Sequence, residues 1–185
     1  MANGTLKVSN IQTSSGSGTI TIGQSGETVT VASGATQTIA NNTPSFLVKK
    51  TSSQAINDVT KTLVTWDSEE IDTDSAFASN KFTVPTGKAG KYFFSSVINL
   101  EDSSLYATNS YFYKNGTEYA SAAFGNYSSS DYMSPTLVNN IILDLSVGDY
   151  IEVYAQGNTS DGGTLNVFDN GGSTLFSWFQ GFKLT

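Results

Sequence analysis

The stretch Lys81–Phe94 constrains the fold of this chain most strongly, because it contains two apolar runs joined by a turn rich in proline and glycine. Phe82 and Val84 alternate with polar residues, which is the two-residue period of a strand with one buried face. Pro85 removes a backbone donor, and glycines at positions 87 and 90 permit a sharp connection. An aromatic run then opens a second strand. We therefore predict a hairpin-like corner whose aromatic side chains must be buried.

Short apolar runs at strand spacing occupy the rest of the chain beyond residue 44, and no segment has a convincing helical period. This pattern predicts an all-β sandwich. Asn115-Gly116, the pair most typical of a two-residue hairpin turn, follows the run Tyr111–Lys114. A long acidic loop is expected at Asp67–Ser79. The ten expected strands are 46–48, 62–66, 82–84, 92–100, 111–114, 118–124, 137–145, 150–155, 165–168 and 174–184.

Residues 1–43 differ in composition from residues 44–185, and the turn cluster Asn41–Pro44 marks the expected domain boundary. The first segment has almost no charge and contains short alternating runs such as Thr19–Ile22 and Thr28–Val31, separated by Ser- and Gly-rich pieces. Such strands are too small to form a core alone. They become stable when identical chains wind together, which predicts a β-rich trimeric stem. The alternative is a flexible linker.

Composition excludes several classes of function. The chain has no histidine and no cysteine, so it lacks the commonest general base and all thiol and disulfide chemistry. A net charge of −7 without a basic patch argues against nucleic acid as a partner. No apolar run is long enough for membrane insertion. Met1–Gly4 lacks the features of a secretion signal, so we expect synthesis in a cytoplasm.

Catalytic and metal sites have little support in the sequence. Glu69, Glu70, Asp72 and Asp74 share one polar stretch and do not form a pair facing each other across a cleft, so we interpret them as a solvated loop or a weak cation site. We predict that the protein is not an enzyme and has no cofactor. Calcium stays open as an alternative, because carboxylates in glycine-rich turns could bind it; the candidate ligands are Asp161 and Asp169.

Four motifs, in order, resemble the globular head of complement C1q, a jelly roll shared with tumour necrosis factor. They are Lys81–Phe94, Tyr113–Gly116, Leu143–Tyr150 and Ser177–Leu184, so the resemblance covers about residues 44–185. It implies a ten-strand jelly-roll head that forms a homotrimer with aromatic residues near the threefold axis. The alternative for each such residue is the core of its own sandwich. The implied interface residues are Tyr106, Tyr113, Tyr119, Phe124, Tyr154 and Phe179.

The N-terminal segment resembles, more loosely, the start of tail-fibre and virion-appendage proteins of bacteriophages, in which a Ser/Thr-rich trimeric stem precedes a globular tip. This resemblance implies a homotrimeric virion structural protein, made in the bacterial cytoplasm, whose first segment contacts other virion proteins. The residues implied for virion attachment are Leu6, Val8, Ile11, Ile20, Ile22, Val29 and Val31. The alternative is a secreted or surface-displayed trimeric binding module of bacterial origin.

Two predicted loops have the composition of a surface that binds carbohydrate, since tyrosine can stack on sugar rings while Asn and Asp hydrogen-bond to hydroxyls. They span residues 104–109 and 126–132. The alternative is an ordinary solvated turn at each place. If the loops act as predicted, the head attaches to a host-surface carbohydrate or protein; the candidate contacts are Tyr106, Asn109, Asn126, Tyr127, Asp131 and Tyr132.

Overall fold

A computed structural model describes residues 43–125, 135–168 and 175–184, together with the single positions 11, 21, 22, 26, 28, 30 and 33. The chain divides into two units, Met1–Ile39 and Ala40–Thr185, and the strands described below all belong to the second. The boundary between residues 43 and 44 stays a prediction. Of the residues predicted for attachment, Ile11 and Ile22 are exposed. The other five lie outside the described residues: Leu6, Val8, Ile20, Val29 and Val31.

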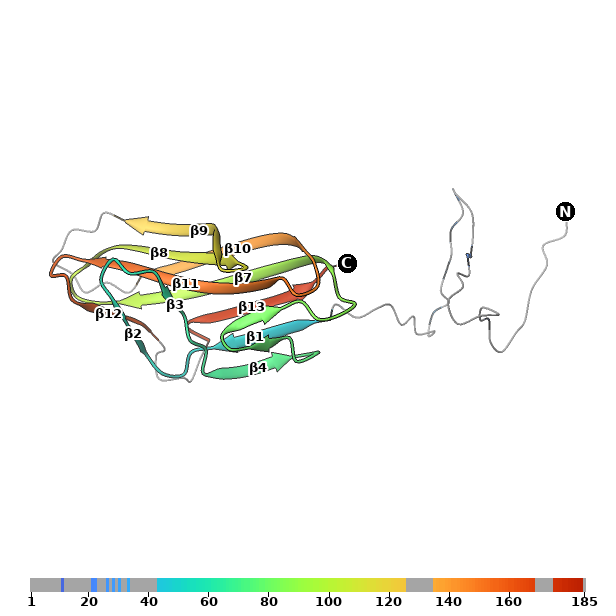
Figure 1. Cartoon of the computed structure of the whole chain (residues 1–185), viewed down its shortest axis with the longest axis horizontal. Coiled ribbons are helices and arrows are strands. Elements are labelled where there is room, and N and C mark those ends of the chain that lie inside the picture. Colours follow the sequence, from blue (N-terminus) through green and yellow to red (C-terminus); the bar gives the residue numbers. More distant parts are fainter. Residues whose placement is uncertain are drawn as a thin grey trace. The chain divides into compact units, whose positions relative to one another are not determined.

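The second unit is built from two antiparallel sheets. Figure 1 shows the long strands β7, β8, β10 and β11 running along the length of the domain. The seven-stranded sheet contains β2 (Gln54–Asn57), β12 (Thr164–Val167), β7 (Gly90–Glu101), β13 (Trp178–Lys183), β1 (Ser45–Lys49) and β4 (Ser68–Asp72) in that order, with β10 (Thr136–Leu145) paired to β7. The six-stranded sheet contains β5 (Phe77–Ala78), β6 (Lys81–Thr83), β11 (Tyr150–Thr159), β8 (Leu105–Lys114) and β9 (Thr117–Gly125), with β3 (Thr62–Leu63) paired to β11.

The all-β prediction is confirmed, and the described residues form thirteen strands in place of the ten expected. The three additional strands are β2, β4 and β5. Strand β2 offers one buried apolar residue, Ile56, and β5 has two residues, so neither has a readable period. Strand β4 corrects the expected acidic loop at Asp67–Ser79: its charged residues form an edge strand on β1, with Ile71 opposite Leu47. Charged side chains are common on edge strands because they discourage further pairing.

The corner at Lys81–Phe94 connects the two sheets and is not a hairpin. Strand β6 pairs with β5 and β11 in one sheet, whereas β7 pairs with β10 and β13 in the other. Glycines 87 and 90 have positive φ values of 77° and 144°, which allow the chain to change sheets. Both strands still direct aromatic rings into one core, where Phe82 lies 5.3 Å from Tyr92 between ring centroids.

Aromatic rings from both sheets meet at the centre of the sandwich. The Phe46 ring stacks on Phe82 at 5.1 Å and meets Phe179 edge-on at 4.8 Å. Each of these rings is essentially buried, which stabilises the fold by about 2–3 kcal/mol per side chain. Gly181 is required by this packing, because a Cβ atom there would lie 2.5 Å from the Phe94 ring.

Two turns at one end of the six-stranded sheet are joined by side-chain hydrogen bonds. Asn115 and Gly116 have φ values of 53° and 75°, as a two-residue hairpin turn between β8 and β9 requires. The Asn115 amide donates to the Asp149 carboxylate at 2.8 Å, and Lys114 pairs with the same carboxylate at 3.0 Å. Together with the backbone N–H of Ser146, these groups lower the Asp149 pKa to about 2.

The described part of the chain contains no helix that is long and apolar enough to cross a membrane.

Candidate interaction surfaces

The outward face of the seven-stranded sheet carries two rows of apolar side chains. Strand register places Trp178, Val97 and Val138 in one row across β13, β7 and β10. A second row places Phe182, Phe93 and Ile142 across the same strands. We call these six residues the apolar face. The alternate residues of β7, from Tyr92 to Leu100, point the other way and are buried in the core.

The edge strand β10 contributes the most exposed part of the apolar face. Val138 is 54% exposed and Ile142 is 62% exposed, and β10 pairs with no described strand other than β7. Phe93 and Phe182 pack against each other at 5.5 Å and are only partly buried. An antiparallel sheet that faces water normally presents polar side chains there. Exposed apolar side chains on such a sheet are typical of a surface that binds another molecule.

None of the apolar-face residues was predicted as an interface from the sequence. A signal for them is present, because Leu137–Leu145 and Tyr92–Leu100 carry apolar residues at both odd and even positions. A run that is apolar on both sides is typical of a strand covered on both faces. The core of the sandwich covers only one face of β7 and β10.

The six-stranded sheet also carries aromatic residues on its outward face, and three of its tyrosines have partners within the chain. Tyr113 and Tyr154 stack at 4.1 Å. The Tyr111 hydroxyl donates to the Gln156 side chain at 2.6 Å, and the Lys61 ammonium lies 4.5 Å from the centre of the Tyr111 ring. Burial raises the pKa of both the Tyr111 and the Tyr154 hydroxyl. We call Tyr111, Tyr113 and Tyr154 the tyrosine face.

The aromatic residues predicted for a trimer interface divide into three groups. The prediction is wrong for Phe179, which is 0% exposed and belongs to the core of its own sandwich. Tyr113 and Tyr154 are partly buried in the tyrosine face. Tyr106, Tyr119 and Phe124 are exposed. An interface role for these five residues stays a prediction.

The two predicted carbohydrate loops have different outcomes. Most of the expected loop at residues 104–109 is strand, because β8 begins at Leu105. The turn before it is tighter than expected, since Asp102 accepts a hydrogen bond from the Ser104 backbone at 2.7 Å. Tyr106 and Asn109 therefore lie on β8. The other candidate contacts, Asn126, Tyr127, Asp131 and Tyr132, lie outside the described residues.

The two candidate calcium ligands are not brought together in the described residues. Asp161 accepts hydrogen bonds from the Gly163 backbone at 3.0 Å and from the Ser104 hydroxyl at 2.9 Å, and these donors lower its pKa. Asp169 lies outside the described residues. Within the described ranges, no three Asp or Glu side chains are placed to bind one metal ion.

Known structures similar to this chain are jelly-roll domains. Murine APRIL, at 13% identity, covers 76% of this chain and 98% of its own, with a TM-score of 0.54. Eiger TNF from S. frugiperda, at 14% identity, covers 76% of this chain and 92% of its own, with a TM-score of 0.52. The head has a C1q/TNF-like jelly-roll fold. The globular domain of zebrafish complement 1qA protein, at 18% identity, covers 77% and 98% with a TM-score of 0.49.

No protein-family model matches the chain, and no curated protein matches it significantly. At these low identities the structural similarity establishes the fold alone, so the function has to be argued from the surfaces of the head.

Proposed function

We propose that this protein is a non-enzymatic attachment protein whose head forms a homotrimer through the apolar face. The observation that carries the proposal is the exposure of Val138 and Ile142 on a sheet whose other side already forms the core. Three copies around one axis would remove this apolar surface from water. They would also cover the edge of β10 that pairs with no described strand and that could otherwise pair with other chains.

The chemistry of the apolar face fits burial against a copy of itself. Its two rows end at Val138 and Ile142 on β10, and the row between them contains Gln180, Ser95 and Asn140. Apolar rows give the contact its free energy, and a polar row between them can fix its register through hydrogen bonds. The ion pair between Lys91 and Asp144 lies at one end of the face, where it remains accessible to water.

The biological setting that we propose is a bacteriophage virion, as part of a tail fibre, head fibre or other appendage. Its support is the Ser/Thr-rich segment of residues 1–43, with the pattern of a trimeric stem that joins other virion proteins. The head would then touch a host surface or another virion protein. A trimer makes the second and third contacts intramolecular, so weak single contacts add up to firm attachment. A bacterial secreted or surface-displayed trimeric module is the alternative, because it would use the same head.

Two measurements test this proposal. Sedimentation equilibrium of the full chain should give the mass of three chains, and a single-chain mass at micromolar concentration would contradict the trimer. Mass spectrometry of purified particles should detect the protein if it is a virion component. Its absence from particles, together with its presence in bacterial culture medium, would favour the alternative.

A further inference from the structure

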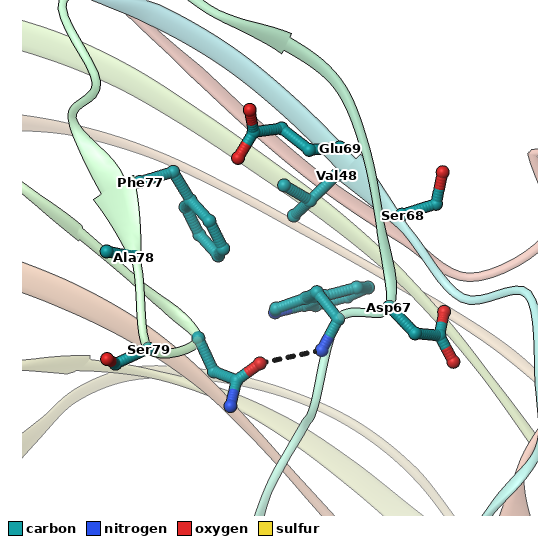
Figure 2. A pocket seen from close by; sticks show the side chains of 9 residues that line it. Val48, Asp67, Ser68, Glu69, Phe77, Ala78 and Ser79 are labelled. Atoms are coloured by element: carbon teal, nitrogen blue, oxygen red, sulfur yellow. Dashed lines mark hydrogen bonds between the residues drawn. The ribbon is translucent and has the colours of Figure 1, made fainter.

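A cavity of about 280 Å³ lies outside both faces described above, between β4 and the β5–β6 hairpin, with Val48 of β1 also in its lining. Its walls include two aromatic side chains, Trp66 and Phe77. Figure 2 shows the Phe77 ring reaching from the hairpin toward β4, with the Glu69 carboxylate projecting over the same space. The cavity opens to solvent, so a ligand could enter it without a rearrangement of the core.

The two aromatic walls are held in place by the core behind them. The Phe77 ring stacks on Phe46 at 5.1 Å, and Trp66 lies 6.0 Å from Phe179 between ring centroids. Asp72 accepts hydrogen bonds from the backbone N–H groups of Ala76 at 2.9 Å and Phe77 at 3.1 Å. The walls are therefore positioned before any ligand arrives, which reduces the entropy lost on binding.

The turn at one end of the cavity has an unusual backbone. Ser79 and Asn80 connect Ala78 to its partner Lys81, and both have positive φ values, 52° and 62°. Glycine normally occupies at least one of these positions in a two-residue hairpin turn, and a serine in the left-handed region costs about 1 kcal/mol. Strain of this kind concentrates at ligand-binding sites. Here the turn also places the Asn80 side chain so that its Oδ1 accepts from the Trp66 backbone N–H at 2.8 Å.

Several polar groups of the cavity have no partner among the described residues. The Trp66 Nε1–H is buried and makes no hydrogen bond. The Asn80 Nδ2 and the Glu69 carboxylate line the same cavity, and neither forms a hydrogen bond or ion pair with a described residue. Because the Trp66 Nε1 atom has almost no accessible surface, the cavity offers a ligand the Asn80 amide as a free donor and the Glu69 carboxylate as a free acceptor, beside two aromatic rings.

The neighbouring Asp67 carboxylate is not free to bind a ligand, because other groups of the protein already bind it. It accepts from the Thr51 backbone at 2.5 Å and from the Ser52 hydroxyl at 2.5 Å, and it pairs with the buried Lys50 ammonium at 3.2 Å. Although partial burial raises its pKa, these donors outweigh that effect and lower it. Glu69 is thus the free carboxylate of the cavity.

We propose that this cavity binds one ring of a neutral sugar. The apolar C–H face of a sugar ring can pack on Trp66 or Phe77, and its hydroxyls can both accept from Asn80 Nδ2 and donate to Glu69. A quaternary ammonium ligand would suit the rings and the carboxylate, but it has no acceptor for the Asn80 amide. The inference deepens the proposed attachment function, since it gives that function a ligand class.

The test uses the full chain and the methyl glycosides of glucose, galactose, mannose and N-acetylglucosamine as probes. The chain has two tryptophans, so its proton–nitrogen NMR spectrum contains two indole resonances, and Trp66→Phe assigns them. We expect one of these probes to shift the Trp66 indole resonance with a Kd on the order of 1 mM, as the ligand efficiency of a small ligand allows. The Trp178 resonance should stay in place.

Adjacent glutamates on β4 supply a matched pair of variants. Glu69→Ala should weaken sugar binding at least about tenfold, because it removes a charged acceptor. Glu70→Ala should leave binding unchanged, since Glu70 pairs with Lys49 at 2.8 Å and does not line the cavity. Both side chains are exposed, so neither change should prevent folding.

Three results would overturn the inference. The first is the absence of any Trp66 shift with all four glycosides at roughly 50 mM, far above the expected Kd. The second is a shift that persists undiminished in Glu69→Ala, and the third is a response to tetramethylammonium but to none of the sugars. If the protein is a trimer but fails these tests, the sugar site is refuted and the proposed assembly is not. If the protein is a single chain but passes them, the proposed assembly is refuted and the sugar site is not.

Discussion

The two outward faces of this sandwich both carry large side chains, but they differ in how far contacts within the chain cover those side chains. On the tyrosine face, Tyr113 stacks on Tyr154, and Tyr111 has a hydrogen-bond acceptor and a cation within its own chain. On the apolar face, Val138 and Ile142 remain more than half exposed. The presence of tyrosines in a strand is therefore weak evidence for an interface, because rings such as Tyr113 and Tyr154 can pack on each other within one chain.

The largest expected effect comes from placing charge on the apolar face. The double substitution Val138→Glu and Ile142→Glu should dissociate the trimer, since burying an unpaired carboxylate costs several kcal/mol. Association should weaken at least about a thousandfold, as measured by sedimentation equilibrium. The control is Val147→Glu, because Val147 is 50% exposed but lies in the turn between β10 and β11, away from this face. If Val147→Glu dissociates the trimer equally, the choice of face is wrong.

A substitution at Phe179 distinguishes a core role for this residue from the interface role predicted from the sequence. Phe179→Ala should lower the free energy of unfolding by about 3–5 kcal/mol, because it leaves a cavity beside Phe46, Phe94 and Phe112. Urea unfolding at one fixed protein concentration measures this change. If Phe179→Ala left the stability unchanged but abolished assembly, Phe179 would belong to the interface and not to the core.

Removing one ring of the tyrosine face should have a smaller effect. Tyr154→Ala should cost about 2 kcal/mol, because the residue is only partly buried and loses its stack on Tyr113. The oligomeric mass should not change. If Tyr154→Ala dissociated the trimer with little loss of subunit stability, the tyrosine face and not the apolar face would be the assembly surface.

Acid should destabilise the turns of the six-stranded sheet with little direct effect on the apolar face. The Asp149 pKa is about 2 in the folded chain against an ordinary value of 3.8, so its ionised form favours folding. This contribution is complete above pH 3.8 and is lost as the pH falls toward about 2. Asp149→Asn should cost about 1 kcal/mol at neutral pH and flatten the acid limb of a plot of stability against pH. An unchanged acid limb would contradict this role.

Local patterns in the sequence are sufficient to predict the fold class. Phe82, Tyr92 and Phe94 must be buried wherever their strands lie, and Asn115-Gly116 specifies a hairpin from its own backbone preferences. The partners of each strand depend on contacts distant in sequence. For that reason the corner at Lys81–Phe94 resembled a hairpin, although it joins two sheets, and Phe179 could not be assigned to the core.

The two candidate sites were harder to predict because each depends on strand register. Ile142 and Leu143 are adjacent and equally apolar, and only the pairing of β10 with β7 determines that Ile142 is exposed while Leu143 is buried. The cavity combines Trp66, from the expected strand 62–66, with Phe77, from the segment that was expected to be an acidic loop. The sequence alone shows that this segment is acidic. That aromatic side chains surround Glu69 follows only from the positions of β4 and β5 in the fold.

Thiol protection shows directly whether the apolar face is covered in solution, because the chain contains no cysteine of its own. Val138→Cys and Val147→Cys place single thiols at sites that are 54% and 50% exposed in one chain. If the apolar face is the assembly surface, a maleimide should label the first at least about tenfold more slowly than the second under native conditions and equally fast in denaturant. Equal native labelling rates would show that the apolar face is uncovered in solution and would contradict a trimer built through it.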